Sequence, residues 1–448
     1  MSIAGRSEIG VKRMDIETLG HAGLLIRDDV GDPVLFTDPW ITGSCYWRSW
    51  WLQSYPREAL VDELTQVKFC FITHEHPDHF HTASIRLLGK GIHFLSPDLP
   101  QEHIARYLSG QGYTASVVPA FRWKAIHRDV RILSIPLFND DSVLLIDTPA
   151  AVIVNLNDAK PRARQLRQLC GWLDNAVPGK TRILLSSYSP ASIVNSFMRN
   201  AQRVSLREKA DYIRYVGNNC RLLKIDHYMP FASQVIYKRS DPAWANDFKV
   251  TFGDLEALWS GGRTRLLPPF ARMNLLSGAY TCVPPECYNH DDQPVLRKVQ
   301  AQQALDALVS FDDEDVDRLR RKLNYCRWVL ALLFPRGIGF TLENTQLHYS
   351  PWSGTLSRGA ATGDFALRVP AQAFKDALEY GHFGDLGITM FTMVMLNSSI
   401  HPRRVYLFFI VMTLHDYGHT ATLRNWLKWL RHTITIQRWR IPGIAQTG

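Results

Sequence analysis

Residues 67–79 read VKFCFITHEHPDH, and this stretch decides the fold. Its first seven residues are mostly apolar and predict a short buried strand. Four side chains that commonly bind metals follow the strand at once: His74, His76, Asp78 and His79. In an extended segment residues two apart point the same way, so His74 and His76 can converge on one cation while Asp78 and His79 face a second. Imidazole and carboxylate ligands suit zinc, iron and similar dications, so the stretch predicts a two-metal site.

Two motifs precede this stretch, Gly20-His-Ala-Gly-Leu24 and Phe36-Thr-Asp-Pro-Trp40. Together with His-x-His-x-Asp-His they resemble the metallo-β-lactamase superfamily, in which the early aspartate, here Asp38, closes a strand beside the metal pocket. Further motifs resemble the branch that contains CMP-N-acetylneuraminate hydroxylase and related sugar-nucleotide hydroxylases. These are Asp141-Ser-Val-Leu, Asn155-Leu-Asn-Asp158, Ser186-Ser-Tyr-Ser-Pro-Ala191 and Pro230-Phe-Ala-Ser233. The resemblance covers about residues 15 to 240 and is faint beyond them.

The resemblance also implies the remaining ligands. Asp158 would bridge both metals, and Asp141 would stand where many hydrolases of the superfamily place a histidine. The last ligand is normally a histidine after the final strand of the domain, and His227 is the nearest candidate. Asp78 and Asp158 are the expected catalytic residues.

The sugar-nucleotide hydroxylases carry a Rieske iron–sulfur centre, which needs paired Cys and His ligands. This sequence has no C-x-H motif, and Cys287-Tyr-Asn-His290 has a C-x-x-H spacing without a partner half. We therefore expect two divalent metal ions, with iron favoured over zinc or manganese, and no Rieske cluster. An oxidative reaction would then need an external electron donor.

Two kinds of chemistry stay open. Asp78, Asp141 and Asp158 make the site rich in oxygen ligands, which favours a di-iron oxygenase or hydroxylase acting on a small, anionic or carrier-linked substrate. The alternative is a metal-dependent hydrolase that uses a metal-bridging hydroxide on an ester, thioester, lactone or phosphodiester. Fold alone supports the hydrolase, but a fold is a weak guide to chemistry.

Residues 40–51, WITGSCYWRSWW, are dense in aromatic side chains. Such density is typical of core packing or of an interface. The alternative is a pocket wall over the metals, in which Trp40 and Trp47 contact the substrate and Arg48 binds an anionic group.

Apolar segments that alternate with helical and turn segments predict a layered α/β fold. We expect a metallo-β-lactamase αββα sandwich as the catalytic domain over residues 1–245 and an additional α+β domain for substrate or accessory functions over residues 246–448. Within the first domain the pattern predicts a helix over residues 204–216 and a strand over residues 221–225.

The composition is that of a globular protein, with 46% hydrophobic and 21% charged residues. The net charge is +9, and positive residues cluster at 160–167, 318–322 and 403–440. These clusters are either solvated helix faces or surfaces that attract an anionic substrate. No binding motif accompanies this charge, so we expect no nucleic-acid partner. No apolar run is long enough for a transmembrane segment, and no export signal is evident at the N-terminus. The seven cysteines show no disulfide pattern. Together these features predict a cytoplasmic location.

Overall fold

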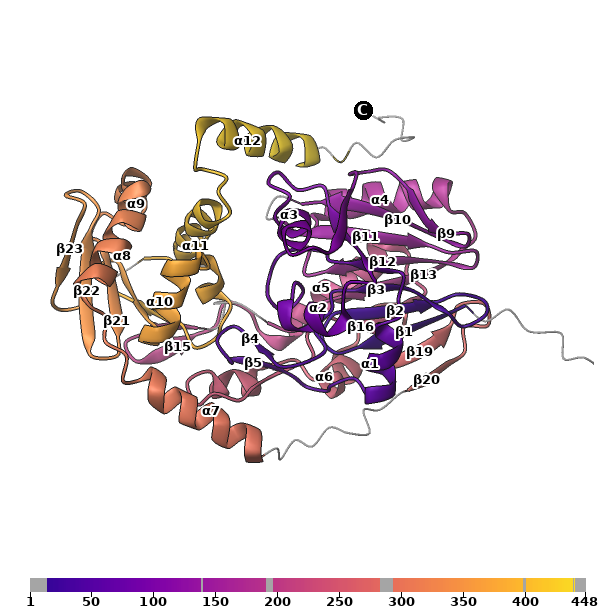
Figure 1. The fold of residues 1–448 in the computed structure, drawn as a ribbon, viewed down its shortest axis with the longest axis horizontal. Coiled ribbons are helices and arrows are strands. Elements are labelled where there is room, and N and C mark those ends of the chain that lie inside the picture. The colour runs from indigo at the N-terminus through magenta and orange to yellow at the C-terminus, as the bar shows by residue number, and fades with distance from the viewer. Residues whose placement is uncertain are drawn as a thin grey trace, which may run out of the picture.

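Two stacked β-sheets form the larger part of the molecule (Figure 1), in a computed structural model that describes residues 14–137, 140–190, 196–282, 293–397, 400–437 and 439. The first sheet has the strand order β20-β19-β1-β2-β3-β6-β7-β8. Its strands are β1 (Asp15–Leu19), β2 (Gly23–Arg27), β3 (Pro33–Thr37), β6 (Phe69–Phe71), β7 (His93–Pro97), β8 (Thr114–Val118), β19 (Ala271–Asn274) and β20 (Tyr280–Cys282). Strands β3, β6, β7 and β8 are parallel, so their carboxyl ends share one edge.

The second sheet has the order β18-β16-β13-β12-β11-β10-β9. Its strands are β9 (Lys124–His127), β10 (Val130–Pro136), β11 (Ser142–Asp147), β12 (Ala151–Asn157), β13 (Thr181–Ser186), β16 (His227–Pro230) and β18 (Arg265–Leu266). Strand β13 runs parallel to β12 and to β16. The carboxyl ends of these three strands therefore also lie at one edge.

Alternation along the strands explains the layers. In β2, Leu24 and Ile26 belong to the apolar core between the sheets, whereas Leu25 packs in the core beneath the helices of the first sheet. In β12, Ile153 faces the core between the sheets, and Val152 faces the helices of the second sheet. The covering helices are α1 (Glu58–Leu64), α2 (Thr82–Leu88) and α3 (His103–Gly110) on one side, and α4 (Ala163–Ala176), α5 (Lys209–Leu223) and α6 (Phe252–Leu258) on the other. The predicted αββα sandwich is confirmed.

A second lobe is built on a third sheet, with the order β15-β14-β25-β24-β21-β22-β23. Its strands are β14 (Phe197–Arg199), β15 (Gln202–Val204), β21 (Ile338–Leu342), β22 (Thr345–Ser350), β23 (Thr355–Arg358), β24 (Phe365–Arg368) and β25 (Met393–Leu396). Its helices are α8 (Asp313–Tyr325), α9 (Arg327–Leu333), α10 (Ala371–Tyr380) and α11 (Arg403–Asp416). Two further helices, α7 (Gln293–Asp306) and α12 (Leu423–Gln437), contribute no described residue to the core of this lobe. Aromatic side chains such as Phe340, Phe365 and Phe408 fill its core.

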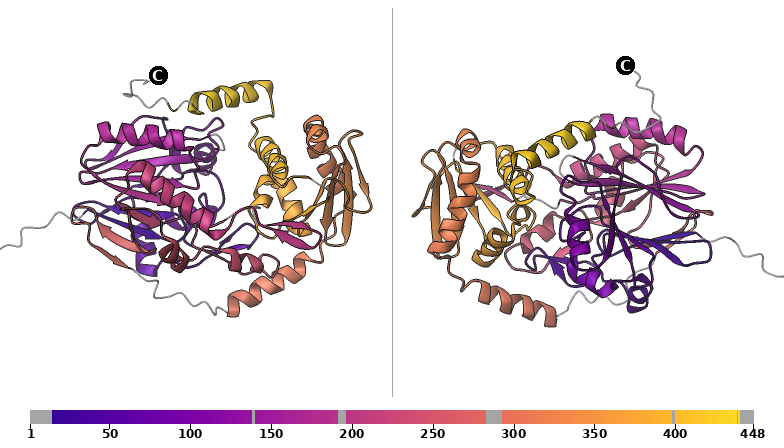
Figure 2. Two further views of the ribbon diagram at one scale, coloured as in Figure 1. Left: turned by 180° about the vertical axis from the view of Figure 1, so that it is seen from behind. Right: turned by 45° about the horizontal axis from the view of Figure 1, so that its top comes forward.

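The two lobes exchange chain segments. Strands β19 and β20 follow residue 245 yet pair with β1, and the hairpin β14–β15 precedes it yet pairs with β25. The division at residues 245 and 246 stays a prediction, and three strand pairings join the two sides of it: β1 with β19, β16 with β18, and β14 with β25. Figure 2 shows the two lobes from other sides, with α7 and α12 at opposite edges of the molecule.

Between the lobes lies a small sheet of order β17-β5-β4, made of β4 (Ser44–Cys45), β5 (Trp50–Leu52) and β17 (Val235–Tyr237). Two 3₁₀ helices, Ala243–Phe248 and Gly384–Gly387, flank this region. Helix α5 is longer than the sequence predicted, because it ends at Leu223 and not at residue 216. The strand predicted at residues 221–225 is therefore the end of this helix and the turn after it, and β16 begins only at His227.

The six described cysteines form no disulfide bonds with one another. Among the described helices, none combines the length and the apolar character that crossing a bilayer requires.

Arg239 ties the lobes together and provides a test of this packing. It is 3% exposed, and its guanidinium lies 2.9 Å from Asp241 and 3.1 Å from Asp306 of α7. Arg239→Ala leaves two partly buried carboxylates without their cation, so we expect a loss of about 3 kcal/mol in the free energy of the first unfolding transition in urea. Arg128→Ala removes a surface ion pair and serves as the control, with little change expected. Equal midpoints for the two variants would contradict this role.

Candidate metal centre

The predicted metal ligands lie in a loop at the edge of the first sheet. Strand β6 ends at Phe71, and α2 begins at Thr82, so residues 74–81 turn between them. The turn is closed by hydrogen bonds from the backbone N–H groups of His79 and Phe80 to the carbonyl of His76, at 2.9 and 2.7 Å. This turn directs the imidazoles and Asp78 toward the ends of the neighbouring strands.

Three groups of ligand atoms gather there, each with all its atoms within 4.8 Å of one another. They are His74, His76 and Asp141; His21, Asp78 and His79; and His74, His79 and Asp158. The third group takes one histidine from each of the other two. Asp158 Oδ2 lies 3.3 Å from His79 Nε2, so this carboxylate stands where it could contact both ions. The structure thus brings together six of the seven predicted ligands.

His21 joins the site although the sequence reasoning assigned it no role. It lies in the turn between β1 and β2, is 2% exposed, and places Nε2 3.1 Å from Asp78 Oδ2. His79 Nε2 is also 3.1 Å from the same oxygen. The signal was present in the Gly20-His-Ala-Gly-Leu24 motif, since a polar ring between two buried strands needs a partner.

His227, the expected last ligand, lies elsewhere. It is the first residue of β16 and pairs with Ile183 of β13. The metal site instead lies at the carboxyl ends of the strands, where Ser186 of β13 pairs with Asn157 of β12 and with Pro230 of β16. Three residues of strand separate His227 from that end, about 10 Å. The physical reason is the longer helix α5, which moves the start of the strand to His227.

Residues around the ligands hold them in place. Asp38 follows β3 and accepts hydrogen bonds from Thr73 N at 2.7 Å and Thr73 Oγ1 at 2.9 Å. The amide of Asn157 donates to Asp38 and, at 2.9 Å, to Thr73 Oγ1. His79 Nδ1 lies 3.3 Å from Asp38 Oδ2, so Nε2 is the atom turned toward Asp78 and Asp158. Such partners fix the ring orientation of metal-ligating histidines.

The residues present fit metal ions. His74 Nε2 is buried and has no hydrogen-bond partner among the described residues, which an ion would provide. Burial and the neighbouring His79 lower the pKa of His74 to about 4, and burial and His74 lower the pKa of His76 to about 4. Both rings are therefore neutral at pH 7, the form that binds metals.

Opposite charges stabilise the part of the site formed by His21, Asp78, His79 and Asp158. Burial alone would lower the pKa of His79, but Asp78, Asp158 and Asp38 outweigh it and raise that pKa well above its usual value. Burial would raise the pKa of Asp78, yet His79 and His21 lower it well below its usual range. Burial likewise opposes the shift of Asp158, whose pKa is lowered by His79. Asp78 and Asp158 therefore stay ionised and can compensate the charge of cations.

The three predicted substrate contacts, Trp40, Trp47 and Arg48, differ in their exposure and surroundings. Trp40 is 1% exposed and packs 5.6 Å from the His21 ring, in an aromatic cluster with Tyr46 and Trp50. Arg48 is exposed on the surface. Trp47 lines a cavity, where its indole N–H donates to Asp376 of α10 at 3.0 Å.

This cavity, of about 220 Å³, lies between the lobes and is lined by Tyr46, Trp47, Pro77, Asp376, Tyr380, His382 and Asp385. It borders the metal ligands, because Pro77 precedes Asp78 and the Tyr46 hydroxyl donates to Asp78 Oδ1 at 2.5 Å. The cavity therefore lies directly beside the candidate metal ligands.

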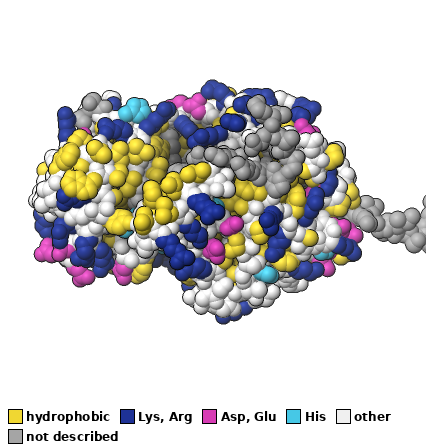
Figure 3. Space-filling model, turned by 90° about the horizontal axis from the view of Figure 1, so that it is seen from above, with side chains coloured by type: hydrophobic (Ala, Val, Ile, Leu, Met, Phe, Trp, Pro, Cys, Tyr) yellow, Lys and Arg dark blue, Asp and Glu magenta, His cyan; other side chains and the backbone are white. Residues whose placement is uncertain are grey.

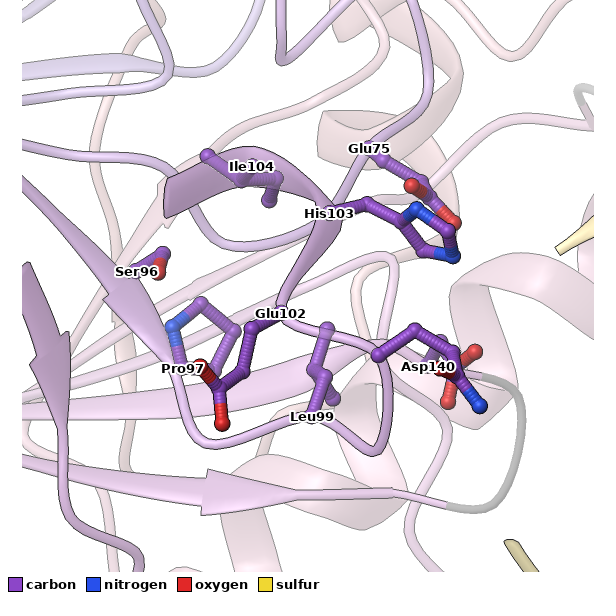
Figure 4. A pocket seen from close by; sticks show the side chains of 9 residues that line it. Glu75, Ser96, Pro97, Leu99, Glu102, His103, Ile104 and Asp140 are labelled. Atoms are coloured by element: carbon purple, nitrogen blue, oxygen red, sulfur yellow. The ribbon is translucent and has the colours of Figure 1, made fainter. Parts of the chain in front are cut away.

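A second, much smaller cavity lies on the other side of the histidine loop (Figure 4), next to Glu75, His103 and Asp140. Its volume of about 10 Å³ suits at most one water molecule. Asp140 there accepts a hydrogen bond from His419 Nε2 at 2.5 Å. The Cys287 to His290 pair lies outside the described residues.

Comparisons with known proteins agree with the motif. No family model matches the chain. Relatives include the cytidine monophosphate-N-acetylneuraminic acid hydroxylases of Asterias rubens, 33% identical over 90 residues, and Cricetulus griseus, 24% identical over 245 residues. These matches cover 20% and 51% of this chain but only 13% and 41% of the relatives, so the chain spans less than half of their length. The metallo-β-lactamase fold protein YhfI from Bacillus subtilis is 10% identical over 60% of this chain and 99% of its own, with a TM-score of 0.37.

The chain has a metallo-β-lactamase fold, of the kind found in metal-dependent enzymes. Its two facing sheets lie between layers of helices, and the His-x-His-x-Asp-His loop lies at their edge. Within that class, the sequence is similar to the CMP-N-acetylneuraminic acid hydroxylase branch, as the motifs around Asp141 and Asp158 predicted.

The ligand groups predict how metal content responds to substitution. Asp158→Ala removes the carboxylate shared by both positions, so we expect the retained metal to fall below one ion per chain. His21→Ala removes a ligand of one group only and should leave one tightly held ion. Elemental analysis after reconstitution and desalting measures both. His227→Ala is the matched control, and loss of metal in that variant would contradict the assignment.

Asp385 predicts a pH dependence of stability. Burial, then Asp416 and Asp78, raise its pKa to about 8. Between the unfolded value near 4 and pH 8, the folded state holds a proton that the unfolded state has lost, so this contribution to stability falls as pH rises. We expect Asp385→Asn to unfold at higher urea than the parent at pH 8 and to show a smaller gain at pH 5. A gain that did not change with pH would contradict the protonated state.

Proposed function

We propose that this protein is a dinuclear iron oxygenase that hydroxylates a small molecule bound between its lobes. One observation carries the proposal. The groups His74, His76, Asp141 and His21, Asp78, His79 each combine two imidazoles with one carboxylate. That combination is typical of non-haem iron(II) oxygenases, whereas purely structural zinc sites favour cysteine and histidine.

The carboxylates support iron over zinc. Asp141 supplies an oxygen ligand where the superfamily's hydrolases usually have a histidine, and Asp158 adds a further one. Hard, anionic oxygen ligands favour the higher oxidation states through which dioxygen chemistry passes. When bound, two such ions would supply the activation of dioxygen.

The protein's own residues position this chemistry. Asp38, Thr73 and Asn157 fix the His79 ring, and the Tyr46 hydroxyl holds one oxygen of Asp78 so that the other faces His79. The aromatic cluster around Trp50 packs against His21 and excludes water from that side of the site. Exclusion of water protects an oxidising site from side reactions.

The cavity suggests the substrate class. The described lining contains Asp376 and Asp385 but no Lys or Arg, so it suits hydroxyl or amino groups better than an anion. Trp47 and Tyr380 offer aromatic faces for an apolar part. We therefore propose a neutral or cationic small molecule in place of the anionic or carrier-linked substrate that the sequence predicted. The reaction would consume dioxygen, two electrons from an external donor and two protons, and yield the hydroxylated product and water. A cytoplasmic location remains part of this proposal.

Dioxygen uptake tests the function. Protein reconstituted with iron(II) without air should consume dioxygen when a chemical reductant and a library of hydroxylated or amine compounds are added. We expect Asp141→Ala to lower the rate about 100-fold or more, because even partners of metal ligands contribute 10- to 100-fold. His227→Ala should leave the rate unchanged.

The competing hydrolase would give the opposite pattern. Zinc-loaded protein would then turn over ester, thioester or phosphodiester probes without dioxygen, and iron-loaded protein would show no uptake above a heat-denatured control. Either result would overturn the oxygenase proposal.

A further inference from the structure

Helices α9, α11 and α12 expose large apolar side chains to solvent. Helix α9 exposes Trp328 and Leu332 at 60% and 76%, and α12 exposes Leu423 at 73%. Further exposed members are Val329 of α9, Leu407 and Ile410 of α11, and Trp426, Leu427 and Ile434 of α12. We call these side chains the apolar face. Apolar side chains gathered to this extent usually mark an interaction surface.

Contacts show that α9 and α11 lie side by side. Arg404 of α11 donates to the carbonyl of Leu333 at the end of α9, at 2.6 Å. At the other end, Tyr325, just before α9, stacks 4.2 Å from His415 of α11. Figure 1 shows α9, α11 and α12 toward the same edge of the molecule, and Figure 3, seen from that edge, shows hydrophobic and basic side chains intermingled.

Helix α12 is amphipathic in an unusual sense, because its apolar stripe faces solvent. Leu423, Leu427 and Ile434 recur at spacings of four and seven and are all exposed. Trp426 and the half-buried Leu430 complete the same stripe. A stripe of this kind normally packs on a core, so its exposure among the described residues indicates a binding surface.

The same helices carry positive charge. Helices α9, α11 and α12 contain Arg327, Arg403, Arg404, Arg424, Lys428 and Arg431. Their one acidic residue, Asp416, is buried and paired with Lys322. On α12 the basic residues Arg424, Lys428 and Arg431 follow the same four-and-three spacing and form a stripe beside the apolar one.

We propose that this face binds the surface of an anionic lipid bilayer. Tryptophan and leucine side chains would enter the boundary between headgroups and acyl chains, and the adjacent arginines and lysine would contact lipid phosphates. Tryptophan is favoured at that depth, where one end of its ring is apolar and the other polar. The charge favours this partner over a second copy of the chain, because two such faces would bring like charges together.

Vesicle co-sedimentation tests the proposal on the full chain, without added metal. We expect binding to phosphatidylcholine vesicles that contain about one third phosphatidylglycerol, little binding to phosphatidylcholine alone, and release by salt. Lys428→Glu with Arg431→Glu should weaken partitioning about 25-fold or more, since each basic contact contributes about five-fold. Trp426→Ser with Leu427→Ser should weaken it to a similar degree.

The matched control changes the same residue types on the opposite edge of the molecule. Leu305→Ser with Lys298→Glu on α7, where Leu305 is 59% exposed, should leave vesicle binding unchanged. Because the substituted side chains are exposed, circular dichroism should show unchanged folding for every variant. Equal binding to neutral and anionic vesicles, or equal loss in the α7 control, would overturn the proposal. So would a dimer that dissociates in Trp426→Ser with Leu427→Ser while vesicles bind none of the proteins.

Discussion

The contact between His79 Nε2 and Asp158 Oδ2 is the constraint on which the centre depends. His79 comes from the loop after β6 in one sheet, and Asp158 directly follows β12 in the other. The two meet only because the sheets stack with the relevant strand ends at the same edge. The core between the sheets, with Phe71 and Ile153 among its members, therefore fixes the metal site as well as the fold.

This arrangement has an energetic cost in the absence of ions. Asp38, Asp78 and Asp141 are almost completely buried, and like charges at such short range repel one another. His21 and His79 relieve part of that cost through ion pairs. Metal ions would relieve the rest, so folding of the site and metal binding are coupled, as in other metalloproteins whose ligands are buried before the ion arrives.

Much of the centre follows from the sequence because its ligands are local. His74, His76, Asp78 and His79 lie on one loop, and the strand before them is strongly apolar. The motif around Asp158 supplied the partner from the second sheet. The placement of His227 after the final strand was wrong for a physical reason. The segment RLLKI is compatible with a strand or with the end of a helix, and in the structure α5 continues through most of it, so the strand begins only at His227. The interlocked pairing of β14 with β25 joins segments that no local pattern connects.

That pairing has a consequence for how the protein is made. The β14–β15 hairpin leaves the ribosome long before β25, which lies beside it in the finished sheet. Until synthesis reaches β25, strand β14 of the hairpin has an unpaired edge, a state that is prone to aggregation. The second lobe expressed by itself would lack one margin of its sheet. Neither half is therefore an independent module, and shuffling them by gene fusion would split a single cooperative sheet.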